Sequence, residues 1–204
     1  MKPQVFYDRV NTALAASPED RRAALVSLHA ELVNEYLDAV RAITPGQAAR
    51  RVRDGRTVAE VVGHIAEWDR YTLLAAGELL SGVVWPRIMS MTGYVDTNGE
   101  EHSFAGVDDF NAFVRARQAD IPWKEIQRLA EDSATCFYTL MSQPRLLSAA
   151  ILQGSRETIW KTSAGEEISL PCGWYLWLTS LEHIAVDHAA DLSSFGGEIT
   201  RPIR

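Results

Sequence analysis

Apolar residues recur every three or four positions through most of this chain, which is the spacing of one face of an α-helix. Four long segments carry the pattern, beginning at Ser17, Thr57, Trp123 and just after Pro171. Each would bury one face against its neighbours. The pattern therefore predicts an all-α protein, a four-helix bundle.

Start and stop signals flank these segments. Ser17 is a favourable N-cap and Pro18 suits the first helical position, while Thr-Pro-Gly at 44–46 ends the first helix. Thr57 and Glu60 have the spacing of a capping box at the start of the second helix. These signals predict helix ends close to the limits of the apolar pattern.

The connections are less regular. Residues 83–107 lack a helical period and predict an irregular insert over one end of the bundle. A shorter helical run begins at 108–109, and residues 157–162 have short strand character within a loop. We expect one domain over residues 1–204, with 196–204 as a tail.

Composition and charge limit the classes of function that this chain is expected to have. The chain has 204 residues, of which 47% are hydrophobic and 23% charged, typical of a soluble globular domain. Its formal net charge of −7 argues against a nucleic-acid partner. The N-terminus lacks the apolar core of a signal peptide and no apolar run reaches the length of a membrane span, so we expect a cytoplasmic protein with no membrane partner. Cys136 and Cys172 form no recognisable motif and are expected to be reduced thiols.

Two histidines lie on inward-facing stripes. His64 follows Val61 by three residues and precedes Trp68 by four, so it shares their face of the second long helix. His188 continues the apolar stripe of the last helix. His183 is five residues earlier, about 140° away around an α-helix, and is expected to be more exposed.

Inward histidines from two facing helices predict a metal site in the bundle core. Imidazole with carboxylate suits Zn, Fe, Ni or Mn, and three protein ligands leave a position open for water. The alternative is that both are hydrogen-bonded core residues. His29 could be a third inward member, although a surface position is favoured, and His102 is expected to be solvated.

Three stretches resemble a known family. RTVAEVVGHIAEWDRY (56–71) resembles the second helix of the DinB-like superfamily, also called YfiT-like metal-dependent hydrolases, and is closest to the ClbS/DfsB branch. FAGVDDFNAFVRARQADIPWKEIQRLAEDS (104–133) is similar to the same branch, and LEHIAVDHAADL (181–192) to the superfamily's last helix. By helix order the likeness spans residues 18–195. It implies a DinB-like four-helix bundle, often a homodimer, with a divalent transition metal, although the ClbS/DfsB branch does not require a tight metal site.

The resemblance also implies metal ligands. His64 matches the ligand of the second helix and His188 the final ligand of the last helix. The family pattern there is H-x-x-x-H, but isoleucine stands four residues before His188, and Asp187 stands four after His183. Two ligand sets stay open: His64 with His183 and Asp187, or His64 with His188 and one of His183, Asp191 or a water.

The resemblance implies a metal-dependent hydrolase or transferase that acts on a small molecule, with Glu67 or Asp187 supporting the metal ligands or acting as general base. The alternative is a non-catalytic, ClbS-like protective protein that binds or sequesters a small molecule at a degenerate metal site. Its pocket would be lined by Trp68, Trp174 and Trp177, although core packing is expected for most of the tryptophans. A third possibility is a dimeric bundle with a vestigial site.

Overall fold

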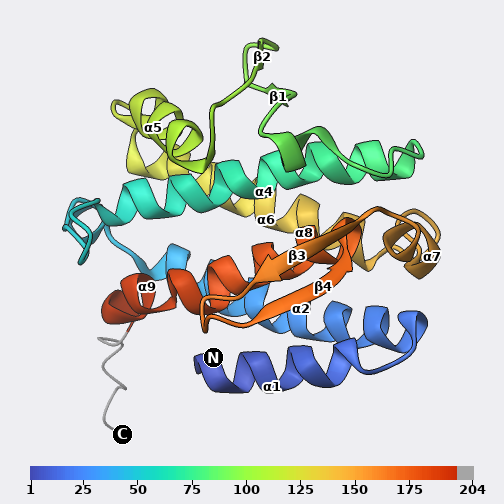
Figure 1. The fold of residues 1–204 in the computed structure, drawn as a ribbon. Helices are drawn as coiled ribbons and strands as arrows, with labels where there is room; N and C mark the ends of the chain where they lie inside the picture. Colours follow the sequence, from blue (N-terminus) through green and yellow to red (C-terminus); the bar gives the residue numbers. More distant parts are fainter. Residues whose placement is uncertain (197–204) are drawn as a thin grey trace, which may run out of the picture.

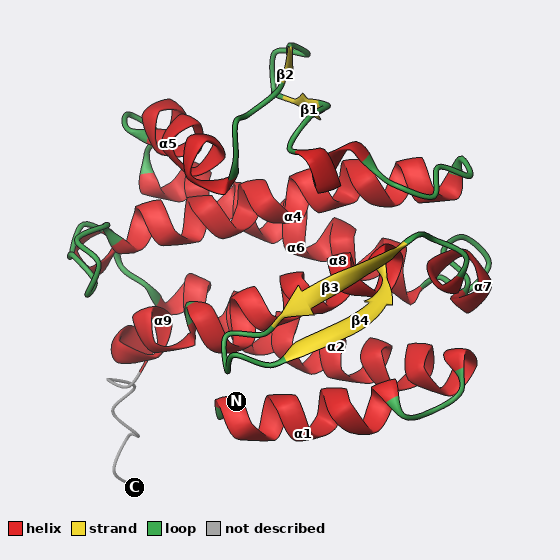
Figure 2. Ribbon diagram, viewed as in Figure 1, coloured by secondary structure: helices red, strands yellow, loops and turns green. Residues whose placement is uncertain are grey.

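The computed structural model describes residues 1–196, so most of the expected C-terminal tail lies outside the described residues. The chain is mostly helical, with two small antiparallel hairpins (Figure 2). The prediction of a mainly α-helical fold is confirmed at this level. None of the described helices is both long and apolar enough to cross a membrane.

Three long helices lie within a residue or two of their predicted limits: α2 (Pro18–Ala42), α4 (Val58–Leu80) and α6 (Trp123–Ser142). The Ser17 side chain accepts a hydrogen bond from the backbone N–H of Asp20, and Thr57 and Glu60 form the predicted capping box. Helix α6 packs against both α2 and α4 (Figure 1). The caps therefore fix where these helices begin, and their apolar stripes fix how they pack.

The last long segment differs from the single α-helix that the sequence predicts. It is divided into α8 (Cys172–Glu182), a π-helical turn η2 (His183–Asp187) and α9 (Ala189–Gly196). Within the turn, the backbone N–H of His188 donates to the carbonyl of His183 at 3.2 Å, five residues earlier. Helix α8 packs against α4, and α9 packs against α2.

Smaller elements complete the chain. Helix α1 (Pro3–Leu14) packs along α2, and the hairpin of β3 (Glu157–Lys161) and β4 (Glu167–Pro171) lies across α8 (Figure 2). Strand character at 157–162 is confirmed by β3. The insert at 83–107 is not entirely irregular, since it holds the 3-10 turn η1 (Arg87–Ser90) and a hairpin of β1 (Tyr94–Val95) and β2 (Glu101–His102). The remaining bounds are α3 (Pro45–Ala48), α5 (Val107–Gln118) and α7 (Ala149–Gln153).

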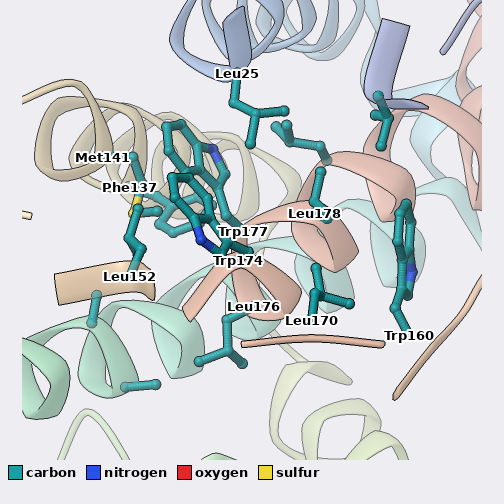
Figure 3. Packing of buried hydrophobic residues seen from close by; sticks show 14 of the residues in the cluster. Leu25, Phe137, Met141, Leu152, Trp160, Leu170, Trp174, Leu176, Trp177 and Leu178 are labelled. Carbon is teal, nitrogen blue, oxygen red and sulfur yellow. The ribbon is translucent and has the colours of Figure 1, made fainter. Parts of the chain in front are cut away.

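Aromatic residues form the centre of the larger core cluster. The indoles of Trp174 and Trp177 are fully buried and stacked, with ring centroids 6.2 Å apart, and Figure 3 shows them side by side. Trp177 Nε1 donates to His29 Nδ1 at 3.2 Å. His29 is fully buried, so the expected surface position for this histidine is wrong. The dense packing fixes α8, which leads into the π turn.

Candidate metal centre

Three histidines converge at the junction of α4 and the π turn. His64 comes from α4, and His183 and His188 stand at the start and end of the turn. One ligand nitrogen from each lies within 4.8 Å of the other two. The Nε2 atoms of His64 and His183 are 3.1 Å apart. These three side chains form the candidate metal centre.

The π turn explains why His183 and His188 meet. In a regular α-helix, residues five apart lie about 140° from each other. A π turn closes its hydrogen bond over five residues instead of four, so it takes in one extra residue. The two rings are consequently brought to the same side, with centroids 4.6 Å apart. His183 is the more exposed of the two, as predicted, since it is half-buried and His188 is buried, but the π turn places its ring beside that of His188 and not on a separate face.

Burial keeps all three imidazoles neutral. Desolvation lowers the pKa of His64 to about 3, with the charge of a protonated His188 as the next contribution. The pKa of His183 lies well below its ordinary value, mainly through burial, and burial also lowers the pKa of His188. Neutral imidazoles offer the lone pair that a metal ion needs.

Asp191 fixes the orientation of one ligand. Its Oδ2 lies 3.1 Å from His188 Nδ1. A carboxylate acceptor at this distance holds the proton on Nδ1 and leaves Nε2 with a free lone pair. Of the two ligand sets left open by the sequence, the geometry brings together His64, His183 and His188, with Asp191 behind them.

The two predicted general bases are in different places. Asp187 is exposed at the edge of the site, where its Oδ1 accepts a hydrogen bond from Ser163 Oγ at 2.6 Å. Glu67 is directed to other partners: its Oε2 accepts from Tyr94 Oη at 2.5 Å and lies 3.4 Å from Arg70 Nη1. Of the two, only Asp187 lines the cavity beside the histidines.

A third carboxylate, Glu182, was missed by the sequence reasoning. It directly precedes the π turn and is buried. Its oxygens accept from Tyr7 Oη at 2.5 Å, Trp160 Nε1 at 2.8 Å and the Ser163 backbone N–H at 2.7 Å. The only signal in the sequence was an acid beside His183 in an otherwise apolar run. Glu182 ties α1 and the β3–β4 hairpin to the segment that carries two of the histidines.

The histidines open onto a cavity of about 520 Å³. Trp68 lines it, as expected, and the walls include Ile88, Leu176 and several hydroxyl-bearing side chains. Trp174 and Trp177 do not line it, because both are buried in the core. The site therefore combines a polar end at the histidines with a largely apolar wall.

A divalent metal fits the three histidines. Two nitrogens bound tetrahedrally at about 2.0–2.1 Å from one ion would lie roughly 3.3 Å apart. The observed 3.1 Å between His64 Nε2 and His183 Nε2 is close to that value. Three histidines with access to a cavity match the donor set of known catalytic zinc sites, which keep an open position, better than that of closed structural sites.

A second acidic group fits a cation less well. Asp96, Glu100 and His102 also bring ligand atoms together in the β1–β2 hairpin. Asp96 Oδ1 already accepts from the backbone N–H groups of Asn98 and Glu100, and Arg117 Nη1 lies 3.0 Å from Oδ2. A guanidinium at that distance repels a metal ion. His102, expected to be solvated, is partly buried and lies 3.2 Å from the same carboxylate.

Cysteine chemistry has little support. The Cys172 thiol is buried, contacts the carbonyl of Val84, and has its pKa raised mainly by burial.

Comparison of the chain with family models, curated proteins and solved structures gave no match. The geometry of the histidine site is therefore the feature that bears on function.

Proposed function

We propose that this protein is a metal-dependent hydrolase or transferase that acts on a small molecule, with a divalent transition metal held by His64, His183 and His188. One observation carries the proposal: three neutral imidazoles from two segments converge at one end of a cavity. The carboxylate behind His188 adds support, because such partners orient metal-bound histidines.

The proposal includes the scaffold. The four members of a DinB-like four-helix bundle would be α2, α4, α6 and the α8–η2–α9 series. The packing of α6 on α2 and α4, and of α8 on α4, supports this assignment. We further propose that the bundle works in the cytoplasm as a homodimer, which size-exclusion chromatography with light scattering would test.

Each residue has a distinct role in the proposed reaction. A divalent ion supplies Lewis-acid activation of water or of a substrate oxygen. Asp187 is the proton acceptor, because it lines the cavity and its carboxylate is accessible. Ser163 orients Asp187 through the 2.6 Å hydrogen bond, and Asp191 keeps the free lone pair of His188 on Nε2.

A non-catalytic small-molecule binding protein is the second candidate. It is favoured by the apolar part of the cavity wall, formed by Trp68, Ile88 and Leu176, on which a ligand could pack without reacting. Loaded protein that binds ligands but turns none over would support this reading.

Metal content tests the proposal first. We expect elemental analysis of protein purified without chelator or affinity tag to find about one equivalent of a transition metal. Single substitutions His64→Ala and His188→Ala should abolish it, whereas the matched control His102→Ala should retain it. A folded wild type that neither contains nor takes up Zn, Ni, Fe or Mn would overturn the proposal. Loss of metal in the His102 variant alone would show that the metal binds at the β1–β2 hairpin and not at the three histidines.

A further inference from the structure

The cavity extends away from the histidines as a groove between α4 and α8. On α4 it is lined by His64, Trp68 and Thr72, and on α8 it continues from Thr179 to Tyr175. Eight residues separate His64 from Thr72, which corresponds to about 12 Å along a helix. A ligand that fills the groove must therefore be elongated.

The middle of the groove has a fixed aromatic wall. Trp68 Nε1 donates to Asn111 Oδ1 at 3.1 Å, and its ring packs edge-to-face on Phe110 with centroids 4.7 Å apart. Ile88 and Leu176 add aliphatic surface. Because Trp68 is held by Asn111 at the cavity wall and by Phe110 behind it, its orientation is set before any ligand arrives, which lowers the entropic cost of binding.

The far end carries a hydrogen-bond donor without a protein acceptor. Among the side chains that the structure describes, none hydrogen-bonds the hydroxyl of Tyr175, whereas the hydroxyls of Tyr7 and Tyr94 each donate to a glutamate. Burial, then the charge of Glu182, raises the pKa of Tyr175, so the phenol keeps its proton at neutral pH. Glu182, beside His183, already accepts three hydrogen bonds, and Lys161 of the cavity wall is paired with Glu167, so neither offers a free charge to a ligand at Tyr175 and an uncharged acceptor is favoured.

We propose that the groove binds an elongated, amphipathic small molecule whose polar head lies at the three histidines, whose apolar middle packs on Trp68, and whose far end carries an uncharged oxygen that accepts a hydrogen bond from Tyr175. This inference rests on the proposed function, since the metal binds the head. It assigns Tyr175 and Trp68 as specificity residues and defines the substrate class as neutral esters, amides or ketones with an extended apolar spacer.

Three hydroxamic acids test the groove and the metal separately. Acetohydroxamic acid has only the metal-binding head, and octanohydroxamic acid adds the apolar chain. The hydroxamate of suberic acid monomethyl ester adds a carbonyl oxygen at the far end. Binding of each is measured by calorimetry to zinc-loaded and to chelator-treated protein. The variants are Tyr175→Phe and the matched control Tyr138→Phe, which lies outside the cavity.

We expect the octanoyl probe to bind at least about tenfold more tightly than the acetyl probe, because its chain buries apolar surface. Tyr175→Phe should weaken the ester probe about three- to tenfold, leave the octanoyl probe unchanged, and have no counterpart in Tyr138→Phe. Equal affinity for all three probes, or equal effects of Tyr175→Phe on both long probes, would overturn the groove inference. Long probes that bind equally well with and without zinc would instead overturn the metal proposal and leave the groove intact. Binding of no probe to either form would overturn the groove inference.

Discussion

The backbone carbonyl of His183 accepts a hydrogen bond from the backbone N–H of His188, at 3.2 Å, across one π-helical turn. The two imidazole rings consequently lie 4.6 Å apart between centroids, although five residues separate them in the chain. The π turn accommodates the extra residue within this one turn. The flanking helices α8 and α9 can therefore continue in the same phase as an uninterrupted helix.

Removal of one residue from the turn should preserve the metal site. Deletion of Val186 leaves a spacing of four, which places both histidines on one face of a regular α-helix. We expect the deletion variant to keep its zinc affinity within about tenfold, whereas one alanine inserted after Val186 should weaken it by at least about a hundredfold. Competition with a chromophoric chelator measures both. Loss of zinc binding on deletion, with helicity intact, would show that the π turn itself is needed.

The helix ends are the part of the fold that the sequence predicts best. The Thr57–Glu60 box and the Ser17 cap act through local contacts, so the first turns of α2 and α4 could be located from a few adjacent residues. The inward positions of His64 and His188 followed from helical periodicity. Each of these features depends on neighbours within one or two turns.

The features that sequence reasoning missed depend on distant partners. Periodicity assumes 3.6 residues per turn, so it could not place His183 inside a π turn. Glu182 is held by Tyr7 and Trp160, which are remote in the chain. His29 accepts from Trp177 across the core. No local sequence pattern predicts hydrogen bonds between residues that are far apart in the chain.

Substitution of Asp191 should weaken metal binding without removing a ligand. Asp191→Asn keeps an oxygen that can accept from His188 Nδ1 but loses the negative charge that makes the imidazole a better donor. We expect a ten- to hundredfold loss of zinc affinity, the range typical of such partners. Asp132→Asn, on the exposed face of α6, is the control. Equal affinities of the two variants would mean that Asp191 has no role at the centre.

The buried histidines should make the metal-free protein sensitive to acid. Burial lowers the pKa of His64 to about 3 in the folded state, below the unfolded value near 6.5. Between these values the unfolded chain binds more protons, so this contribution to stability is present above about pH 6.5 and is lost as the pH falls towards 3. We expect His64→Gln to reduce the loss of unfolding free energy between about pH 7 and 4.5 by roughly 2 kcal/mol. Urea titrations with a chelator present measure the unfolding free energy at each pH. Equal losses in the wild type and in His64→Gln would refute this expectation.

Asp69 should have the opposite pH dependence. Burial raises its pKa to about 8, and its Oδ2 has no hydrogen-bond partner in the described structure. The folded protein thus holds a proton that the unfolded chain releases near pH 4, so stability falls as the pH rises towards 8 and is then constant. We expect Asp69→Asn to be more stable than wild type at about pH 8 by roughly 2–4 kcal/mol, with a smaller difference near pH 5. A difference that does not change with pH would contradict the raised pKa.

Gly63, beside His64, lets α5 approach α4. A Cβ atom at this position would clash with Gln118 Oε1, while Gln118 Nε2 donates to the Gly63 carbonyl at 3.0 Å. Gln118 is buried, so it cannot move aside without losing this bond and its packing. We expect Gly63→Ala to cost about 1–3 kcal/mol of unfolding free energy through overpacking.

The companion substitution Gln118→Ala reverses that expectation. With the amide removed, the clash disappears and alanine is a better helix former than glycine by about 1 kcal/mol. Gly63→Ala should therefore be neutral or stabilising in the Gln118→Ala background, so the double variant should be more stable than the sum of the two single effects predicts. Urea unfolding of the two single variants and the double variant measures this coupling. If Gly63→Ala is equally destabilising in both backgrounds, the close approach of Gln118 is not what requires glycine beside the metal centre.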